Sequence, residues 1–139
     1  MITMSTYTVY EYMKWKFPDL SGALKNGTLD KSSPKSIGVF QGSNTRSQGN
    51  LAIGGIDCTA VRMLPININI RWTDNQKACD DKAIEIYNAL LLETNNFTFK
   101  EDGVKIACIE LLDPSPVQLG RDSKNVCEVT IRANFYYYV

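Results

Sequence analysis

The chain holds few side chains of the kind that perform catalysis. It contains no histidine, the residue that acid–base and nucleophilic hydrolysis recruit most often. Asp80 and Asp81 are adjacent carboxylates, a pair that in principle could bind a metal ion or share a proton. Neighbouring residues on a helix point about 100° apart, so these two groups do not converge and instead indicate a solvated helix face. We therefore expect a protein that is not an enzyme.

The cysteines of this chain are widely scattered, at Cys58, Cys79, Cys108 and Cys127. They lack the C-x-x-C spacing of a zinc or redox site, and no histidine is present to complete a mixed zinc site. Free cysteine is among the most buried residue types, so reduced cysteines packed as small apolar residues are the simplest interpretation. A disulfide stays open as an alternative, but we expect neither a metal nor a cofactor.

Nucleotide binding is weakly supported by the sequence. Gly54-Gly55 leads into a strand and lacks the Gly-Lys-Ser/Thr ending of a phosphate loop. Tyr136 and Tyr138 belong to an aromatic stretch that could stack single-stranded bases, but only Arg132 supplies positive charge nearby. Exposed tyrosines here would favour a protein contact surface. The alternative is that a loop or the first helix covers them.

The length and composition of the chain indicate one ordinary globular domain spanning residues 1–139. Hydrophobic residues make up 44% and charged residues 22% of the chain, which is the composition of a protein with a packed core. Fifteen basic residues balance fifteen acidic ones, so no general attraction to nucleic acid or anionic membrane is expected. No stretch approaches the roughly 18 apolar residues of a membrane span, and residues 1–8 do not resemble a secretory signal.

One strand organises the rest of the chain. Apolar side chains recur at every second position from Ile66 to Trp72, with polar residues between them. Alternate side chains of a strand point to opposite faces, so a strand over residues 56–73 is expected to bury one face. Pro65 cannot donate a ladder hydrogen bond, which predicts a bulge or an edge position early in this strand.

A helix is expected directly after this strand, from Asn75 to about Glu93. The stretch from Thr73 to Gln76 matches a capping box, with Thr73 at the N-cap and Gln76 at the third helical position. Apolar side chains at three- and four-residue spacings form the expected buried stripe: Cys79, Ala83, Ile86, Tyr87, Leu90 and Leu91. This stripe can cover the apolar face of the strand.

The other elements complete a layered domain. A first helix is expected over residues 5–17, capped by Thr6 or Thr8 and ended by Pro18. Further strands are expected at 37–41, 97–100, 104–112 and 126–139, with long polar loops at 42–55 and 113–125. The short strand at 97–100 is optional, so the order is helix, strand, strand, helix, possible strand, strand, strand. This predicts an α+β fold with a mainly antiparallel, four- to five-stranded sheet packed against two helices.

The two strands nearest the C-terminus carry apolar residues differently. The last strand alternates, so one face is expected to be core: Cys127, Val129, Ile131, Ala133, Phe135 and Tyr137. The strand over 104–112 is apolar on both faces, which is typical of a strand in the middle of a sheet. Ile106 and Cys108 are expected on one of its faces, with Ala107, Ile109 and Leu111 on the other.

Five stretches of the chain, taken in order, are similar to one known group of proteins. They are Val9–Lys14 with Phe17-Pro18, Ile37–Gln41, Ile53-Gly54-Gly55 leading into the Ile66–Trp72 strand, Ala83–Leu90, and Leu119–Asp122 before the last strand. Each stretch is weakly specific, and their order and spacing over nearly the full length carry the likeness. The chain resembles the minor capsid or tail-terminator proteins of long-tailed phages and prophages.

That resemblance implies a structural protein of the virion. Members of the group are small α+β domains that assemble into a ring, often of six subunits, on the last ring of the tail tube. The ring halts tube growth and presents a docking face for the head connector. The implied partners are further copies of this chain, the tail tube protein and the head connector protein. No membrane and no specific nucleic acid is implied, although DNA could pass through the ring. The implied location is the head–tail junction of the virion, and the host cytoplasm during assembly.

The subunit and tube contacts are expected mainly in the two long loops. The candidate contact residues are Arg46, Gly54, Gly55, Arg71, Gly120, Arg121, Asp122, Tyr136 and Tyr138. For the charged members, simple solvation at the surface is the alternative. Two other functions stay open: a different head–tail connector or completion (stopper) protein, and a small nucleic-acid or ligand-binding module.

Overall fold

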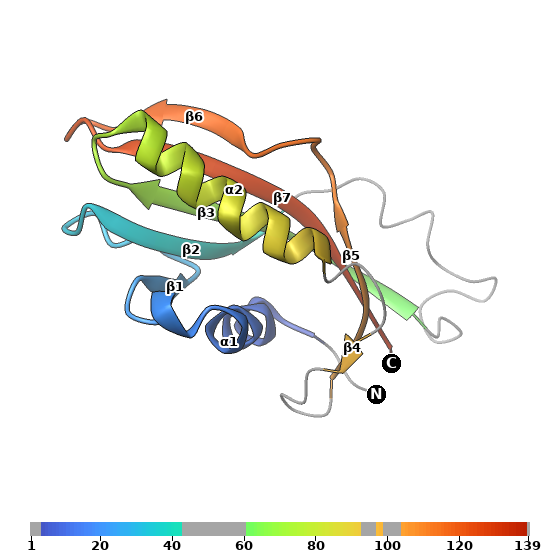
Figure 1. The fold of residues 1–139 in the computed structure, drawn as a ribbon. Coiled ribbons are helices and arrows are strands. Elements are labelled where there is room, and N and C mark those ends of the chain that lie inside the picture. Colours follow the sequence, from blue (N-terminus) through green and yellow to red (C-terminus); the bar gives the residue numbers. More distant parts are fainter. Residues whose placement is uncertain (1–3, 43–60, 93–96, 99–103, 139) are drawn as a thin grey trace.

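A computed structural model describes residues 4–42, 61–92, 97–98 and 104–138. Two helices and seven strands give an α+β fold, as the sequence predicts (Figure 1). In chain order the elements are α1 (Thr6–Lys16), a 3-10 helix (Pro18–Leu20), β1 (Leu24–Asn26), β2 (Lys35–Gln41), β3 (Val61–Trp72), α2 (Gln76–Leu92), β4 (Phe97–Thr98), β5 (Lys105–Leu111), β6 (Val117–Arg121) and β7 (Cys127–Tyr138).

The strands form one mixed sheet in the order β1-β2-β3-β7-β5-β4, and β6 pairs with β7 off this path. Every pair is antiparallel except β1 with β2. The sheet has more strands than expected because β1 and β6 lie in stretches that the sequence assigned to a connector and a loop. β5 and β6 pair with different halves of β7: β5 follows residues 133–138, and β6 follows residues 127–130.

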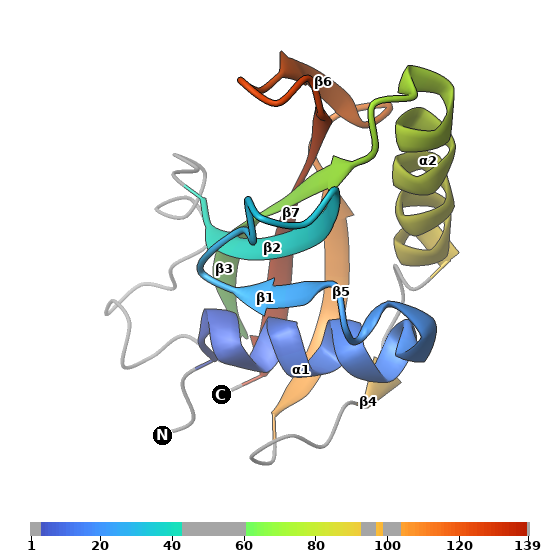
Figure 2. The ribbon, with the colours of Figure 1, turned by 90° about the vertical axis from the view of Figure 1, so that its left-hand side faces the viewer.

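Both helices pack on the same face of the sheet. Phe135 and Cys127 share one face of β7 because they are separated by an even number of positions. The ring of Tyr12 in α1 lies 5.9 Å from the ring of Phe135, and the thiol of Cys79 in α2 lies 3.6 Å from the carbonyl oxygen of Cys127. The two helices therefore cover different ends of one continuous core, as the two views show (Figures 1 and 2).

The alternation predicted for the central strands is confirmed. In β3, Ile66, Ile68 and Ile70 are each at most 1% exposed, and the six alternate positions predicted for the core face of β7 are all buried. β3 lies between β2 and β7, in the middle of the sheet. A strand with one apolar face gains most by this position, since that face then meets apolar residues from both neighbours.

Pro65 produces no bulge, so that part of the expectation is wrong. Its pairing with Asn134 of β7 lies within an unbroken register from Val61 to Arg71. On the other side, the carbonyl of Pro65 accepts a hydrogen bond from the N–H of Gly42 at 2.9 Å, and β2 ends beside it. The position therefore tolerates proline because the missing N–H faces a place where the partner strand stops.

The predicted faces of β5 are wrong because the strand contains a bulge. Ile106 pairs with Tyr137, whereas Cys108 pairs with Tyr136, so the register shifts by one residue between them. The shift turns the following residues over, and Ile109 joins Ile106 in the core at 2% exposure. Ile106 and Cys108, which simple alternation places on one face, thus end on opposite faces.

The start of α2 also differs from the expectation. The helix begins at Gln76, and the side chain of Asn75 accepts a hydrogen bond from the N–H of Ala78 at 3.2 Å. Asn75 therefore occupies the N-cap, and the capping box from Thr73 to Gln76 is wrong. Thr73 has a φ of 48°, and its hydroxyl accepts the N–H of Asn75 at 3.3 Å, so this threonine makes the corner before the helix.

The first helix is slightly shorter than expected. Its N-cap is Ser5, and neither Thr6 nor Thr8 takes that place. Thr8 contributes to the N-terminal cap from within the helix, because its hydroxyl accepts a hydrogen bond from the N–H of Ser5 at 3.4 Å. The helix ends at Lys16, and Pro18 then opens the 3-10 turn, as expected of a residue that disfavours helical geometry in its predecessor.

Candidate functional site

A strand whose residues are all exposed lies where the sequence predicted a loop. All five residues of β6 are exposed. One side of its backbone pairs with β7, and the other side pairs with none of the described strands. In Figure 1 it runs along the upper rim of the molecule, beside the start of α2. A strand edge of this kind presents unpaired N–H and C=O groups to any extended polypeptide that approaches it.

A bulge shapes this edge. Gln118 pairs with Val129 and Gly120 with Glu128, so Leu119 is an additional residue in β6. Gly120 has a φ of 102°, a backbone conformation that residues with a side chain rarely adopt. Position 120 therefore favours glycine because of its backbone conformation. The same irregularity interrupts the flat edge of β6 after its first few residues.

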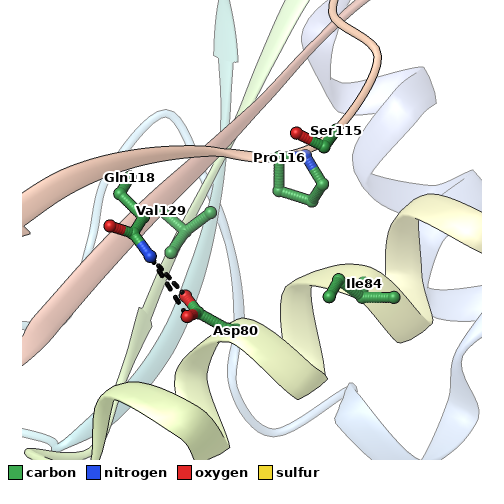
Figure 3. Close-up of a pocket in the computed structure, with 6 residues that line it drawn as sticks. All are labelled: Asp80, Ile84, Ser115, Pro116, Gln118 and Val129. Atoms are coloured by element: carbon green, nitrogen blue, oxygen red, sulfur yellow. Dashed lines mark hydrogen bonds between the residues drawn. The ribbon is translucent and has the colours of Figure 1, made fainter.

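A groove separates β6 from α2. It encloses about 180 Å³ and is lined by Asp80, Ile84, Ser115, Pro116, Gln118 and Val129 (Figure 3). Part of its lining is exposed apolar surface, since the side chain of Ile84 is 46% exposed. The site therefore combines apolar surface with unpaired backbone groups, the two features that recognise an added strand.

The polar group of the groove is the carboxylate of Asp80. The side-chain amide of Gln118 donates to its two oxygens at 3.1 and 3.2 Å, as the dashed lines in Figure 3 show. The amide of Gln76 donates to it from one helical turn away, at 2.8 Å. Both donors are neutral, so this carboxylate is held in place by amides while its charge is not balanced by an ion pair among the described residues.

Three of the predicted contact residues meet in a corner next to this edge. Arg71, which is only 1% exposed, donates from Nε and Nη2 to the carboxylate of Asp122, with the Nε distance at 3.0 Å. It also donates to the carbonyl of Ser33. The other oxygen of Asp122 accepts the N–H groups of Lys124 and Val126 at 2.9 and 3.0 Å. Backbone donation from Val126, together with Arg71, lowers the pKa of Asp122.

Arg121 ties the same corner to the start of α2. Its Nη1 donates to the carbonyls of Asp74 and Asn125, at 2.7 and 3.0 Å. The ammonium of Lys124 donates to the carbonyl of Lys31 at 3.0 Å. These bonds hold the turn between β6 and β7 against two other segments, so Arg71, Arg121 and Asp122 position the edge from inside the chain.

The remaining predicted residues lie elsewhere. Tyr136 and Tyr138 are half-buried on the face of the sheet opposite the helices, at the far end of β7 from β6. The hydroxyl of Tyr136 donates to Glu110 at 3.2 Å, and the ammonium of Lys105 lies 5.3 Å from the ring centroid of Tyr138. Arg46, Gly54 and Gly55 lie outside the described residues.

Sequence reasoning missed the strand edge and the groove. Val117 and Leu119 alternate with polar residues after Pro116, which is the available signal for a short strand. The surrounding Pro, Ser, Gly and Asp residues indicated a loop instead. Asp80 was assigned to a solvated face, and only the pairing of β6 with β7 brings Gln118 to it.

The described residues give little support to other kinds of site. They contain no group of three or more metal-ligating side chains, and none of their helices is long and apolar enough to cross a membrane. Cys79, Cys108 and Cys127 are free thiols. Burial, with smaller contributions from Cys127 and Asp80, raises the pKa of Cys79 to about 11, so its thiol stays protonated and unreactive at neutral pH.

Comparison with known proteins adds no family assignment: no family model matches the sequence, and no curated protein matches it.

Proposed function

We propose that this chain is a tail-terminator protein of a long-tailed phage or prophage. In this role copies of the chain form a ring, with six as the expected number, on the last ring of the tail tube. The ring ends tube growth and provides the surface on which the head connector docks. Two observations support this proposal. They are the ordered sequence resemblance over nearly the whole chain, and the exposed, partly apolar surface around β6.

The observation that carries the proposal is the open edge of β6 beside the groove. A ring subunit must meet identical neighbours through surfaces that are held rigidly before assembly. β6 is fixed to the sheet through β7, and its turn is anchored by Arg71 and Arg121. The exposed apolar side chains of Ile84, Val117 and Leu119 give this edge the surface that a protein partner would bury.

A purified sample, alone and mixed with tail tubes, tests the proposal by electron microscopy. We expect rings at high protein concentration, or caps at tube ends that keep the tubes at a uniform length. Tubes assembled without the protein serve as the control and should continue to grow to variable lengths. Monomers in dilute solution agree with the proposal because the ring can require the tube as a template. Uncapped tubes of variable length, together with no rings at high concentration, would refute it.

A further inference from the structure

The exposed large apolar side chains of the described residues form two groups on this molecule. One group lies on the outer side of α1 and consists of Tyr7 and Trp15. Clusters of exposed apolar side chains are typical of protein contact surfaces, so the molecule offers two such surfaces. The second group lies beside the groove and along α2, and consists of Ile84, Leu91 and Leu92 of the helix with Val117 and Leu119 of β6.

The exposed apolar residues of the two helices have nearly equal spacings. Tyr7 and Trp15 are eight residues apart in α1, which corresponds to about 12 Å along the helix axis. Ile84 and Leu91 are seven residues apart in α2, or about 10 Å, and they lie on the same side of that helix. An α1 laid along an α2 therefore brings both aromatic rings onto the two aliphatic side chains at once.

The two helices carry opposite net charge. α1 has Lys14 and Lys16 in its last turn and a single carboxylate, Glu11, which pairs with Lys14 at 3.6 Å. α2 has three carboxylates and two lysines, and each lysine pairs with a carboxylate of the same helix, at 2.8 and 2.9 Å. The third carboxylate, that of Asp80, accepts hydrogen bonds from side-chain amides. The opposite charges favour contact between the two surfaces.

The distribution of charge selects an antiparallel arrangement of the helices. Asp80 lies one turn before Ile84, and both residues line the groove beside β6 (Figure 3). When Trp15 meets Ile84 and Tyr7 meets Leu91, the basic last turn of α1 lies near Asp80. In a parallel arrangement the same lysines would lie near the last seven residues of α2, which include no carboxylate.

A second copy must supply the α1 that meets α2. Both helices bury one side against the same face of the sheet, over different ends of the core (Figure 2). Their outer sides point away from the sheet, so these sides cannot pack against each other within one copy. A contact between the β6 edges of two copies is less favourable. It would bring two Asp80 carboxylates together, and the bulge after Gln118 leaves few backbone groups in line.

We propose that α1 of one copy packs antiparallel on α2 of a neighbouring copy, with Trp15 at the groove that Ile84 and Asp80 line. Tryptophan and tyrosine are among the residue types that most often dominate the binding energy of a protein contact. The two surfaces lie at different places on each subunit, so the contact runs head to tail and closes into a ring when its rotation permits. The inference rests on the proposed function and adds to it the pair of surfaces that joins neighbouring subunits.

Substitutions on both surfaces test the inference in the tube-capping assay. Trp15→Ala removes the aromatic anchor, and Asp80→Lys reverses the charge that faces the lysines of α1. Each variant should cap tubes only at a protein concentration at least about tenfold higher than the wild type. Trp15→Phe keeps an aromatic ring and should need less protein than Trp15→Ala.

Glu85→Lys is the matched control for Asp80→Lys. It makes the same charge change on α2, but residue 85 points about 140° away from Asp80 around the helix. This control should cap tubes like the wild type. Circular dichroism and thermal melts of each variant confirm that it folds.

Photo-crosslinking identifies the surface that α1 meets. A benzophenone-bearing phenylalanine takes the place of Trp15, and isotope-labelled and unlabelled copies are mixed before they assemble on tubes or at high concentration. Mass spectrometry then locates the adducts. We expect adducts between a labelled and an unlabelled copy that join position 15 to residues 80–84 of α2 or to residues 115–118 on the other side of the groove.

The outcomes distinguish this inference from the proposed function. Normal capping by the folded Trp15→Ala and Asp80→Lys variants would refute the helix contact and leave the ring function standing. Adducts of position 15 with the tube protein, or within one copy only, would refute the contact as well. Absence of rings and caps with the wild type would refute the proposed function, and the inference with it.

Discussion

At the scale of residues, the corner around Arg71 shows how a buried charge is tolerated. A guanidinium with 1% exposure is stable only when its charge and its N–H donors have partners. The guanidinium of Arg71 donates hydrogen bonds to the carboxylate of Asp122 and to the carbonyl oxygen of Ser33. The sequence singled out Arg71, Arg121 and Asp122, but it could not reveal that they meet, since 51 positions separate Arg71 from Asp122.

The corner predicts a loss of stability in acid. The backbone N–H of Val126, with further contributions from Arg71 and Lys124, lowers the pKa of Asp122 in the folded protein. A lowered folded-state pKa contributes stability above the unfolded-state pKa of about 3.9, and this contribution is lost as the pH falls through the folded-state value. We therefore expect Asp122→Asn to reduce the free energy of unfolding at pH 7 and to flatten its decrease below about pH 5.

Urea unfolding at a series of pH values measures this effect. Asp81→Asn is a suitable control because the carboxylate of Asp81 is exposed and pairs with Lys77 on the same helix, an arrangement that contributes little. The control should keep the acid slope of the wild type. An equally steep slope in Asp122→Asn would show that this carboxylate does not contribute to acid stability.

At the scale of elements, a loop crosses β2 so closely that only glycine fits beneath it. A Cβ atom at Gly38 would lie 2.5 Å from the carbonyl oxygen of Thr28 and 2.6 Å from the ring of Phe40. Backbone atoms cannot move aside as a flexible side chain does. We expect Gly38→Ala to reduce the free energy of unfolding by about 1–3 kcal/mol, measured by urea denaturation.

Gly22→Ala provides the comparison for this substitution. A Cβ atom at Gly22 would meet nothing within 4 Å, and its φ is not in the left-handed region. The control variant should therefore differ little from the wild type. Equal unfolding midpoints for the two variants would mean that the loop over β2 yields easily, contrary to the expectation.

The elements also show what sequence alone can and cannot provide. For long strands with strict alternation, such as β3 and β7, the sequence indicates both that the segment is a strand and which of its faces is buried. The bulge in β5 could not be foreseen, because it shifts the alternation at Ala107 without a distinctive residue. β1 and β6 were missed because three to five residues among turn-forming neighbours carry too short a pattern. The groove depends on β6, so the site was missed with the strand.

At the scale of the whole molecule, both helices and all long strands contribute to one core. Tyr12 of α1 meets Phe135 of β7, and Cys79 of α2 meets Cys127 of the same strand. A core shared in this way should unfold as one cooperative unit. We expect unfolding followed by tryptophan fluorescence and by far-ultraviolet circular dichroism to give the same midpoint.

The two tryptophans make this measurement specific. Trp72 is 9% exposed and belongs to the core, whereas Trp15 is 58% exposed. A Trp15→Phe variant leaves the fluorescence of Trp72, which lies between β2 and α2 and has the ammonium groups of Lys35 and Lys82 about 5.0 and 5.2 Å from its ring centroid. Two separate midpoints would indicate that the end of the sheet near α1 unfolds independently.

The unpaired edge of β6 is a liability for a copy of the chain on which nothing covers it. A strand that accepts the correct chain through backbone groups also accepts wrong ones, since those groups do not discriminate between sequences. The extra residue Leu119 and the left-handed Gly120 shorten the flat run, a feature that works against edge-to-edge pairing. Copies on which nothing covers this edge are therefore prone to aggregate, and a partner that occupies the edge also keeps the protein dispersed.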